Sequence, residues 1–395
     1  MAIEGKADGS VSRRLRLGIV GGGQGAFIGA VHRLAARMDD RYELVAGAFS
    51  SDPERAKASA AELRVAPDRA YADFQKMAEK EAAREDGIDV VAIVTPNHLH
   101  HGPAKAFLEA SIHVICDKPM TTTLEDALDL VRTVRQTGQV FGLTHNYTGF
   151  PMVRHAREMV KAGEVGRVRV VQVEYPQDWL ATRLEETGQK QASWRTDPAR
   201  SGAGGCVGDI GSHAFNLAGF ITGLELEQLC ADLSTFVEGR RLDDDCRILL
   251  RYEGGARGML WASQVAAGNR NALRVRVYGE QGGLEWQQEC PDLLQVFPLG
   301  GPPRTIARMG PGAGLAAARV SRIPAGHNEG YLEAFANLYG DLAEVISARL
   351  EGRPPDPAAL DHPTVLDGAR GVKFITATVE SSRQGAIWVD ARLDL

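Results

Sequence analysis

Hydrophobic and polar positions follow two different patterns along the chain, and the first half shows strands alternating with helices. Short apolar runs, typical of buried strands, fill residues 15–20, 42–49, 89–94, 112–116 and 140–144. Helical spacing covers 26–38 and 124–135, and Asp52-Pro53-Glu54 has the order expected where a further helix begins. Strands that alternate with helices predict an α/β fold with a doubly wound parallel sheet of the Rossmann type.

From Pro151 onward the pattern changes. One amphipathic helix is expected at 151–162, and after it apolar and polar residues alternate, as in strands with one buried face. These alternating runs are 168–175, 246–252, 258–263, 274–278 and 284–288. They predict a largely antiparallel sheet. Residues 298–326 are rich in Gly, Pro and Ala and are expected to form a long loop or lid, before helices at 329–350 and 365–383.

The change of pattern divides the chain into three parts. Residues 1–12 show no periodicity and are expected to be a loose tail. The doubly wound domain is expected to cover 13–150. An α+β domain with an open sheet is expected to cover 151–395, with its last helices packing back on the first domain. A chain of 395 residues is long enough for two such domains.

Composition and charge exclude several classes of protein. Hydrophobic residues make up 44% and charged residues 24%, which are values of a globular protein. The chain has 45 Lys and Arg against 51 Asp and Glu, a net charge of −6. A mildly acidic surface argues against nucleic acid or an anionic membrane as the main partner. No run approaches the roughly 18 apolar residues that span a bilayer, so no membrane contact is expected.

The cysteines and the first residues predict a cytoplasmic location. Five cysteines, an odd number with no CxxC spacing, suggest neither a disulfide framework nor a zinc ribbon. Arg13-Arg14 resembles a twin-arginine export signal. However, the sequence continues with LRLGIV and glycines, whereas an export signal continues with a longer apolar region and a small-residue cleavage site.

Glycines crowd the turn after the first strand, in the sequence GGGQGAFIG. Read as Gly21-x-Gly23-x-x-Ala26, the turn matches the variant of the dinucleotide-binding motif that ends in Ala. Backbone N–H groups at a helix N-terminus can approach a pyrophosphate only where no side chain intervenes. The alternative is a structural glycine turn in another α/β fold, but the flanking strands and helix favour a dinucleotide. Its expected contacts here are Gly21, Gly23, Gln24, Gly25, Ala26 and Phe27.

The end of the second strand bears on the choice between NAD and NADP. An acidic residue there usually binds the ribose 2′-hydroxyl of NAD, and this chain has Ser50 in that place. Serine does not repel a 2′-phosphate, and Arg55 follows closely enough to reach one. Both Ser50 and Arg55 are predicted to contact the cofactor. The sequence is compatible with NAD and with NADP, and NAD is the first choice.

The third strand ends in TPNHLHH, at the carboxyl edge of the sheet where ligands bind in such folds. We expect cofactor contacts from Thr95, Pro96, Asn97 and His100. The three histidines of this stretch also suggest a metal cluster. Neither a carboxylate nor a cysteine accompanies them at ligand spacing, so no metal site is expected.

Two further segments carry residues suited to acid–base chemistry. Lys118 ends the fourth strand beside Asp117 and Pro119, where it is either functional or an ordinary solvated charge. Asp209 and His213 follow a glycine run at a spacing of four, which in an α-helix places both on one face. A carboxylate in this position orients the imidazole and stabilises its protonated form. The alternative is a capping Asp and a surface His.

Together these segments resemble the Gfo/Idh/MocA family of NAD(P)-dependent oxidoreductases, which act on sugars and inositols. The resemblance covers nearly the whole chain: the Gly-rich turn, TPNHLH, the Lys-Pro motif and GGxxxDxxxH before a helix. It implies that Lys118, Asp209 and His213 are the catalytic residues, with Asp117 in place of the family's usual Glu. The stretch HNYTGFP lacks the Arg that many relatives carry. The resemblance also implies a homodimer or homotetramer formed through the second domain's sheet.

Hydride transfer needs a base, a cation and a substrate pocket. His213 is suited to act as the base, and Lys118 is suited to stabilise the negative charge that develops on the oxygen. Asp209 is expected to position these two side chains and to tune their pKa values. The predicted reaction moves a hydride between the nicotinamide and a secondary alcohol of a sugar, cyclic polyol or sugar derivative. Residues expected to contact this small-molecule substrate, with loop packing or helix capping as the alternative, are Tyr147, Trp179, Trp194, Arg195, Asp209, His213 and His327.

Two other functions use the same features. A glycosidase of this type oxidises a ring carbon transiently, eliminates the aglycone and takes the hydride back, so its cofactor is recycled. A cofactor-sensing regulator would have lost catalysis. The joint presence of Lys118, Asp209 and His213, and the lack of a recognisable DNA-binding element, favour an enzyme.

Overall fold

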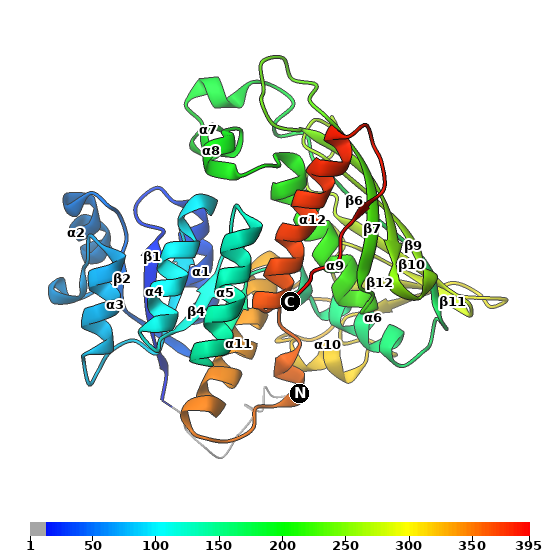
Figure 1. Ribbon diagram of the computed structural model, residues 1–395. Helices are drawn as coiled ribbons and strands as arrows, with labels where there is room; N and C mark the ends of the chain where they lie inside the picture. Colours follow the sequence, from blue (N-terminus) through cyan, green and yellow to red (C-terminus); the bar gives the residue numbers. More distant parts are fainter. Residues whose placement is uncertain (1–12) are drawn as a thin grey trace.

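Two sheets lie side by side in the computed structural model, which describes residues 13–395 (Figure 1). The predicted tail at 1–12 lies outside the described residues. The first sheet is parallel, with strand order β2-β1-β3-β4-β5. Its strands are β1 (Leu15–Gly21), β2 (Tyr42–Ala48), β3 (Val90–Val94), β4 (His113–Cys116) and β5 (Phe141–Leu143). Its helices are α1 (Phe27–Met38), α2 (Pro53–Glu62), α3 (Phe74–Ala82), α4 (His101–Glu109) and α5 (Leu124–Thr137). The predicted doubly wound fold is confirmed.

The order of the strands places a ligand site at one edge of this sheet. The chain runs outward from β1 to β2 and then returns to add β3 on the other side. A crevice forms outside the carboxyl ends of the strands where the winding reverses. The strands are apolar throughout because both faces are covered: all five residues of β3 are buried.

The second sheet has nine strands in the order β13-β12-β11-β10-β6-β9-β8-β7-β14. Every neighbouring pair is antiparallel except β6 and β9, which run parallel. The largely antiparallel prediction is therefore confirmed. The strands are β6 (Val168–Pro176), β7 (Leu226–Ser234), β8 (Asp245–Tyr252), β9 (Arg257–Ser263), β10 (Arg274–Gly279), β11 (Gly282–Gln287), β12 (Leu293–Pro298), β13 (Arg304–Ala307) and β14 (Val389–Asp390).

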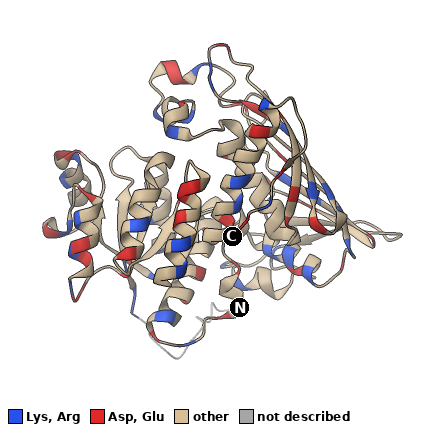
Figure 2. Cartoon of the chain, viewed as in Figure 1, with Lys and Arg blue, Asp and Glu red and all other residues tan. Residues whose placement is uncertain are grey.

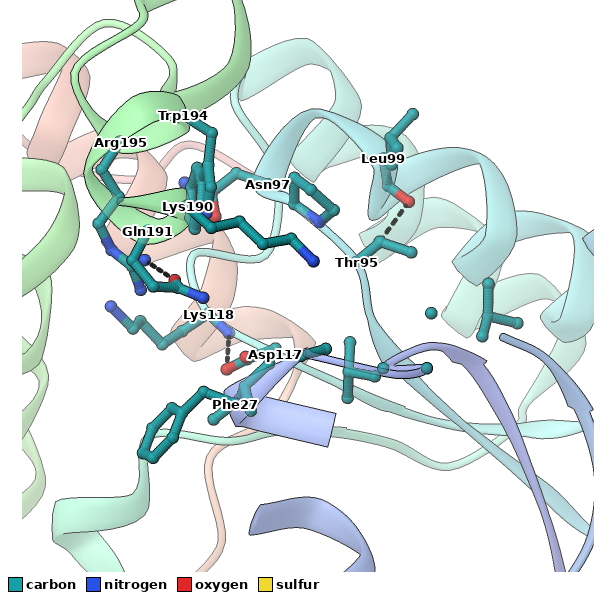
Figure 3. A pocket seen from close by; sticks show the side chains of 18 of the residues that line it. Phe27, Thr95, Asn97, Leu99, Asp117, Lys118, Lys190, Gln191, Trp194 and Arg195 are labelled. Carbon is teal, nitrogen blue, oxygen red and sulfur yellow. Dashed lines mark hydrogen bonds between the residues drawn. The ribbon is translucent and has the colours of Figure 1, made fainter. Parts of the chain in front are cut away.

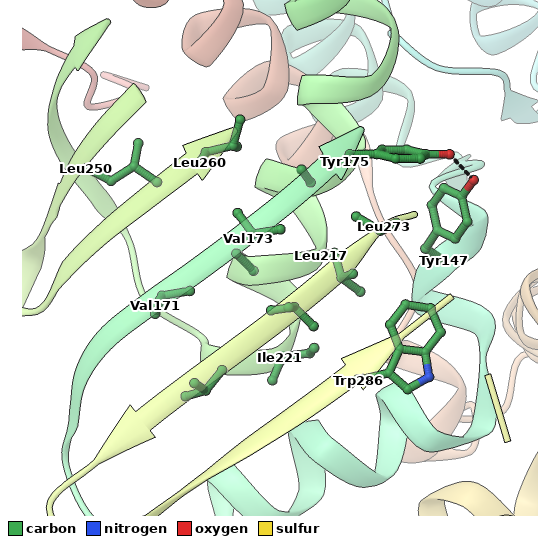
Figure 4. Packing of buried hydrophobic residues seen from close by; sticks show 14 of the residues in the cluster. Tyr147, Val171, Val173, Tyr175, Leu217, Ile221, Leu250, Leu260, Leu273 and Trp286 are labelled. Atoms are coloured by element: carbon green, nitrogen blue, oxygen red, sulfur yellow. Dashed lines mark hydrogen bonds between the residues drawn. The ribbon is translucent and has the colours of Figure 1, made fainter. Parts of the chain in front are cut away.

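One face of the second sheet forms the larger hydrophobic core. Residues such as Val171, Val173 and Trp286 point toward Leu217 and Ile221 of the helix behind them (Figure 4). The helices that cover this face are α6 (Pro151–Lys161), α9 (Ser212–Thr222) and α12 (Val365–Arg383). The opposite face is uncovered in the single chain. Val170, Leu249 and Met259 are 43%, 49% and 46% exposed there.

Helix α11 (Tyr331–Leu350) belongs to the first domain in space although it follows the second sheet in sequence (Figure 1). It packs along α1 and buries Phe335 and Leu342 against the face of the parallel sheet. The Tyr42 hydroxyl donates to the carbonyl of Tyr339 at 2.8 Å, and the Tyr339 hydroxyl lies 2.8 Å from His32 Nδ1.

The segment 298–326 is not the long loop or lid that its composition predicts. It contains β13 and the short helix α10 (Leu315–Arg319). The Arg308 side chain is buried there in ion pairs with Glu329 at 3.0 Å and Asp292 at 2.8 Å. Its glycines and prolines lie in turns between short packed elements. The composition of the segment does not reveal the buried ion pairs of Arg308, which is why it suggests a loop.

Acidic and basic side chains are interspersed over both domains (Figure 2). No helix within residues 13–395 is long and apolar enough to cross a lipid bilayer.

Candidate active site

A cavity of about 940 Å³ lies between the carboxyl edge of the parallel sheet and the second domain. Its walls carry the glycine turn and the ends of β2, β3 and β4 on one side. On the other side are α7 (Lys190–Arg195) and residues of the second domain's core. Figure 3 shows Lys190, Trp194 and Arg195 of α7 facing Lys118 and Phe27 across this space. The site therefore belongs to both domains.

The start of α1 fits a dinucleotide pyrophosphate. No side chain caps this helix terminus, and its first turn has no acidic residue. Its N–H groups are thus free to bind an anion. The turn before it reaches left-handed φ at Gly21 (+83°) and Gly25 (+74°), which glycine adopts without strain. The predicted contacts Gly21, Gly23, Gln24, Ala26 and Phe27 line the cavity, and Gly25 lines an adjoining hollow.

The glycine spacing differs from the sequence interpretation. A Cβ on Gly29 would lie 2.4 Å from the Cα of Gly22, so the close packing of helix on turn depends on Gly29 and not on Ala26. A Cβ on Gly23 would lie 2.7 Å from the carbonyl oxygen of Phe49. Packing against the chain after β2 therefore already requires glycine at position 23, independently of the close approach of a phosphate.

Most of the other predicted cofactor residues also line this cavity. Ser50 and Arg55 lie in its wall beyond β2. The Ser50 hydroxyl accepts a hydrogen bond from the backbone N–H of Asp52 at 3.1 Å. The side chain of Asn97 donates to the carbonyl of Ser201 at 3.1 Å and so connects β3's end to α8 (Pro198–Ser201). Further lining residues from the prediction are Thr95, Pro96, Asp117 and Lys118.

His100 lies beneath the wall and not in it. Its side chain is 1% exposed, and its ring nitrogens lie 2.8 Å from the carbonyl oxygens of Thr95 and Pro119. The ring ties the end of β3 to the segment after Lys118. The structure gives it this packing role, in place of the cofactor contact that its position in TPNHLH predicts.

Lys118 and Asp209 form an ion pair across the two domains, with side chains that are 12% and 14% exposed. Lys118 Nζ donates to the Asp209 carboxylate at 3.0 Å and to its backbone carbonyl at 2.6 Å. The other carboxylate oxygen lies 2.9 Å from Gln264 Nε2 and 3.2 Å from Arg195 Nε. Burial alone would raise the pKa of Asp209. The Arg195 and Lys118 charges and their hydrogen bonds instead hold that pKa well below its usual range.

Asp117 holds the turn that carries Lys118. Its carboxylate accepts from the backbone N–H of Lys118 at 2.8 Å and from the Thr144 hydroxyl at 3.0 Å. The Asp117 side chain therefore connects the carboxyl end of β4 to the carboxyl end of β5.

His213 does not pair with Asp209 as the spacing of four predicts. Its ring packs against Tyr147, with centroids 4.9 Å apart, and its Nδ1 lies 3.4 Å from Nδ1 of His145. Residues Val207–Gly211 form a π-helical turn, so positions four apart do not stack as they do in an α-helix. Burial, followed by the Lys118 charge, lowers the pKa of His213 well below its usual value. The expected stabilisation of protonated His213 by Asp209 is therefore wrong.

Aromatic and amide side chains form the second domain's part of the wall. The hydroxyls of Tyr147 and Tyr175 are hydrogen-bonded to each other (Figure 4). Tyr175 also donates to Asn271 at 2.6 Å. The Arg195 guanidinium lies over the Trp194 ring, 4.3 Å from its centroid. Trp179 also lines the cavity. Such rings and amides suit a ligand with many hydroxyl groups.

The predicted substrate contact His327 lies outside this wall. It is exposed, and its backbone carbonyl accepts a hydrogen bond from Arg308. Among residues 13–395, no cluster of three or more His, Cys, Asp and Glu side chains could hold a metal ion.

Several lining or bonded residues were not selected from the sequence. Gln264 and Tyr175 come from the ends of β9 and β6, which pair in parallel and end together at Pro176 and Ser263. This parallel pairing within an antiparallel sheet places both strand ends near the site, and no sequence pattern indicates it. The other residues missed in this way include His145, Lys190, Gln191, Asn271 and Tyr331.

The fold and the candidate site together are those of a dinucleotide-dependent oxidoreductase, with the cavity between the two domains. Residues 15–145 match the family model described as oxidoreductase family, NAD-binding Rossmann fold. Residues 153–285 match the GFO/IDH/MocA C-terminal domain. The chain belongs to the Gfo/Idh/MocA family of oxidoreductases, which confirms the resemblance seen in its motifs.

Three similar proteins span almost the whole chain. Uncharacterized oxidoreductase YfiI of Bacillus subtilis is 34% identical over 383 residues, 96% of this chain and 98% of that protein. A crystal structure of an oxidoreductase from Sinorhizobium meliloti is 53% identical, with a TM-score of 0.88, and the match covers 96% and 100% of the two chains. An inositol dehydrogenase homolog from Azotobacter vinelandii, solved with NADH and myo-inositol, is 35% identical, with a TM-score of 0.89 and coverage of 96% and 98%.

Proposed function

We propose that this oxidoreductase moves a hydride between a nicotinamide cofactor and a secondary alcohol of a cyclic polyol or sugar. The observation that carries the proposal is the Lys118–Asp209 ion pair beside His213, in the cavity that the glycine turn also lines. The aromatic and amide wall around Tyr147 and Trp194 supports a polyhydroxylated substrate. The Azotobacter vinelandii homolog, solved with myo-inositol, supports the same class.

Lys118 is placed to stabilise negative charge on the reacting oxygen. Its ammonium group has three donors, and two of them are used on the carboxylate and the carbonyl of Asp209. The third is left for the substrate oxygen. The Lys118 ammonium group, next to the reacting oxygen, favours an alkoxide there because a cation stabilises the developing negative charge.

His213 is placed to accept the hydroxyl proton. Burial of the ring, and after it the nearby cations, lower the pKa of His213 and so keep the ring neutral at neutral pH. A neutral imidazole has a free lone pair, which a general base requires. A bound nicotinamide cofactor would supply the hydride acceptor, and the glycine turn at the start of α1 would hold its pyrophosphate.

A panel of substrates tests the proposal. Purified protein is incubated with myo-inositol, other cyclic polyols, sugars and glycosides, each with NAD and with NADP, and both absorbance at the nicotinamide band and product are followed. We expect a polyol or sugar to yield NADH in proportion to oxidised product. Aglycone release from a glycoside without NADH would instead indicate the redox-neutral glycosidase. Dinucleotide binding without turnover of any compound would indicate the regulator.

We propose NAD as the cofactor, supported by the Azotobacter vinelandii homolog bound to NAD+. Ser50 provides no carboxylate against a 2′-phosphate, so discrimination against NADP is expected to be weak. Ser50→Asp is expected to lower the affinity for NADP relative to NAD by about tenfold, through like-charge repulsion. Titration of both reduced cofactors by fluorescence measures the ratio. Ser50→Asn is the neutral control, and a ratio equal in both variants would place the adenosine ribose elsewhere.

A further inference from the structure

Two imidazole rings meet at the inner wall of the active-site cavity, where His213 lines the wall and His145 lies against His213. His145 follows β5 and His213 lies in α9, and their Nδ1 atoms are 3.4 Å apart. The rings are edge-to-face, with centroids 5.3 Å apart and planes at 82°. Both side chains are buried, at 2% and 8% exposure. The contact therefore joins the end of the parallel sheet to a helix of the second domain.

A contact between two Nδ1 atoms requires that one ring donates and the other accepts. If His213 donates, its Nε2 carries the lone pair. If His145 donates, Nε2 of His213 carries a proton instead. Since Nδ1 of His213 is occupied by His145, only Nε2 is left for the substrate. Only the first arrangement lets His213 take a hydroxyl proton, so the partner at Nδ1 determines whether His213 is a base.

The surroundings of His213 offer no better partner for its Nδ1 among the described residues. The charged and titratable side chains that face the two rings are Lys118, Arg195, Tyr147 and Tyr175, and Asp209 lies next to the two cations. Lys118 and Arg195 are cations and cannot accept. The Asp209 carboxylate is taken by these cations and by Gln264. The two tyrosine hydroxyls are hydrogen-bonded to each other.

We infer that His145 is a positioning residue for His213, an inference that rests on the proposed function. Nδ1 of His145 accepts the Nδ1–H of His213 and so holds the tautomer whose Nε2 lone pair faces the cavity. In the reaction the substrate hydroxyl would give its proton to Nε2 of His213, while the carbon that bears this hydroxyl would give its hydride to the nicotinamide. The hydrogen bond to His145 then strengthens, because an imidazolium donates better than a neutral ring. His213 then releases this proton from Nε2 to water, which restores the neutral ring.

Nitrogen NMR of the histidine rings tests this inference without a substrate. In protein labelled with ¹⁵N-histidine, protonated and unprotonated ring nitrogens resonate far apart, and the signals of His213 are those lost in His213→Ala. We expect Nδ1 of His213 to be protonated and Nε2 to be unprotonated at neutral pH. In His145→Phe the Nε2-protonated tautomer is expected to gain population. A proton on Nε2 of His213 in the unmodified protein would overturn the inference.

Kinetics provide a second measurement, with the panel compound that turns over fastest. His145→Phe keeps an aromatic ring but removes the acceptor, and kcat is expected to fall about 10- to 100-fold, the range for losing an outer partner of a functional imidazole. The NADH dissociation constant should change little. The lower limb of the pH–rate profile should move to lower pH, because protonated His213 loses its acceptor. Burial lowers the pKa of His145 to about 3, so above that pH a neutral His145 exerts no opposing charge repulsion on His213. His145→Asn restores an acceptor oxygen and should recover part of the rate.

The controls separate this inference from a packing role and from the proposed function. His362→Phe replaces another buried histidine outside the cavity and should leave the His213 signals and the rate unchanged. If His145→Phe and His145→Asn lose rate and melting temperature together, with the pH limb in place, His145 only packs. If His213→Ala keeps full turnover, the proposed function itself fails. If His213→Ala is inactive while His145→Phe is fully active, only the present inference fails.

Discussion

Replacing Lys118 with alanine is expected to lower kcat by about 10²–10³, the usual effect of removing one donor to a developing oxyanion. The affinity for NADH should fall far less, because the Lys118 ammonium group is held by Asp209 at 2.6 Å and 3.0 Å and its charge matters most as the alkoxide forms. Steady-state kinetics and a fluorescence titration of NADH measure the two quantities separately.

Lys105→Ala is the matched control for this prediction. Lys105 also forms an ion pair, with Asp129 at 2.9 Å, but it lies on α4 at the surface. Its removal should leave kcat unchanged. Equal losses in kcat for both variants would point to a general effect on the fold. A Lys118→Ala enzyme with weakened NADH binding and normal kcat would make Lys118 a cofactor ligand and not a catalytic residue.

Gly29→Ala is expected to abolish dinucleotide binding and to lower the melting temperature. The new Cβ would lie 2.4 Å from Gly22 Cα and 2.5 Å from the Gly22 carbonyl oxygen. Both are backbone atoms, so no change of side-chain rotamer can relieve the clash. Helix α1 must then move away from the turn, and overpacking of this kind costs about 1–3 kcal/mol. Thermal unfolding and NADH fluorescence measure the two effects.

Gly371→Ala provides the comparison for this helix substitution. Gly371 lies inside α12, and a Cβ there would meet no atom within 4 Å. Helix propensity alone predicts that alanine stabilises a helix interior by up to about 1 kcal/mol relative to glycine. The two variants should therefore shift the melting temperature in opposite directions. A stabilised Gly29→Ala protein that still binds NADH would show that the turn and helix can separate without loss.

The fold could be predicted from the sequence because its patterns are local. Runs such as 89–94 are apolar throughout since both faces of the parallel sheet are covered, and the five residues of β3 are all buried. Strand β7 could not be found in this way. A register shift between Leu226 and Gln228 interrupts its alternation, so its apolar residues do not fall on every second position.

The candidate site was predictable only in its individual residues. Separate motifs predict Lys118 and Asp209, and the structure brings the Lys118 ammonium group within 3.0 Å of the Asp209 carboxylate. The pairing of Asp209 with His213 was inferred from α-helical spacing, which a π-helical turn changes. His145 and Gln264 had no signal of their own. Their roles follow from contacts between segments 68 and 55 positions apart, and such distances cannot be read from sequence periodicity.

The position of α11 makes the dinucleotide-binding half of the molecule discontinuous in the gene. A fragment that stops near residue 150 would leave the α1 side of the sheet without Phe335, Tyr339 and Leu342, and would expose an apolar surface to water. The start of α12 belongs to this half as well, because Val365, Ala369 and Val372 pack with α5 and the sheet. A transplanted cofactor domain would therefore have to bring α11 and the start of α12 along with the residues before 150.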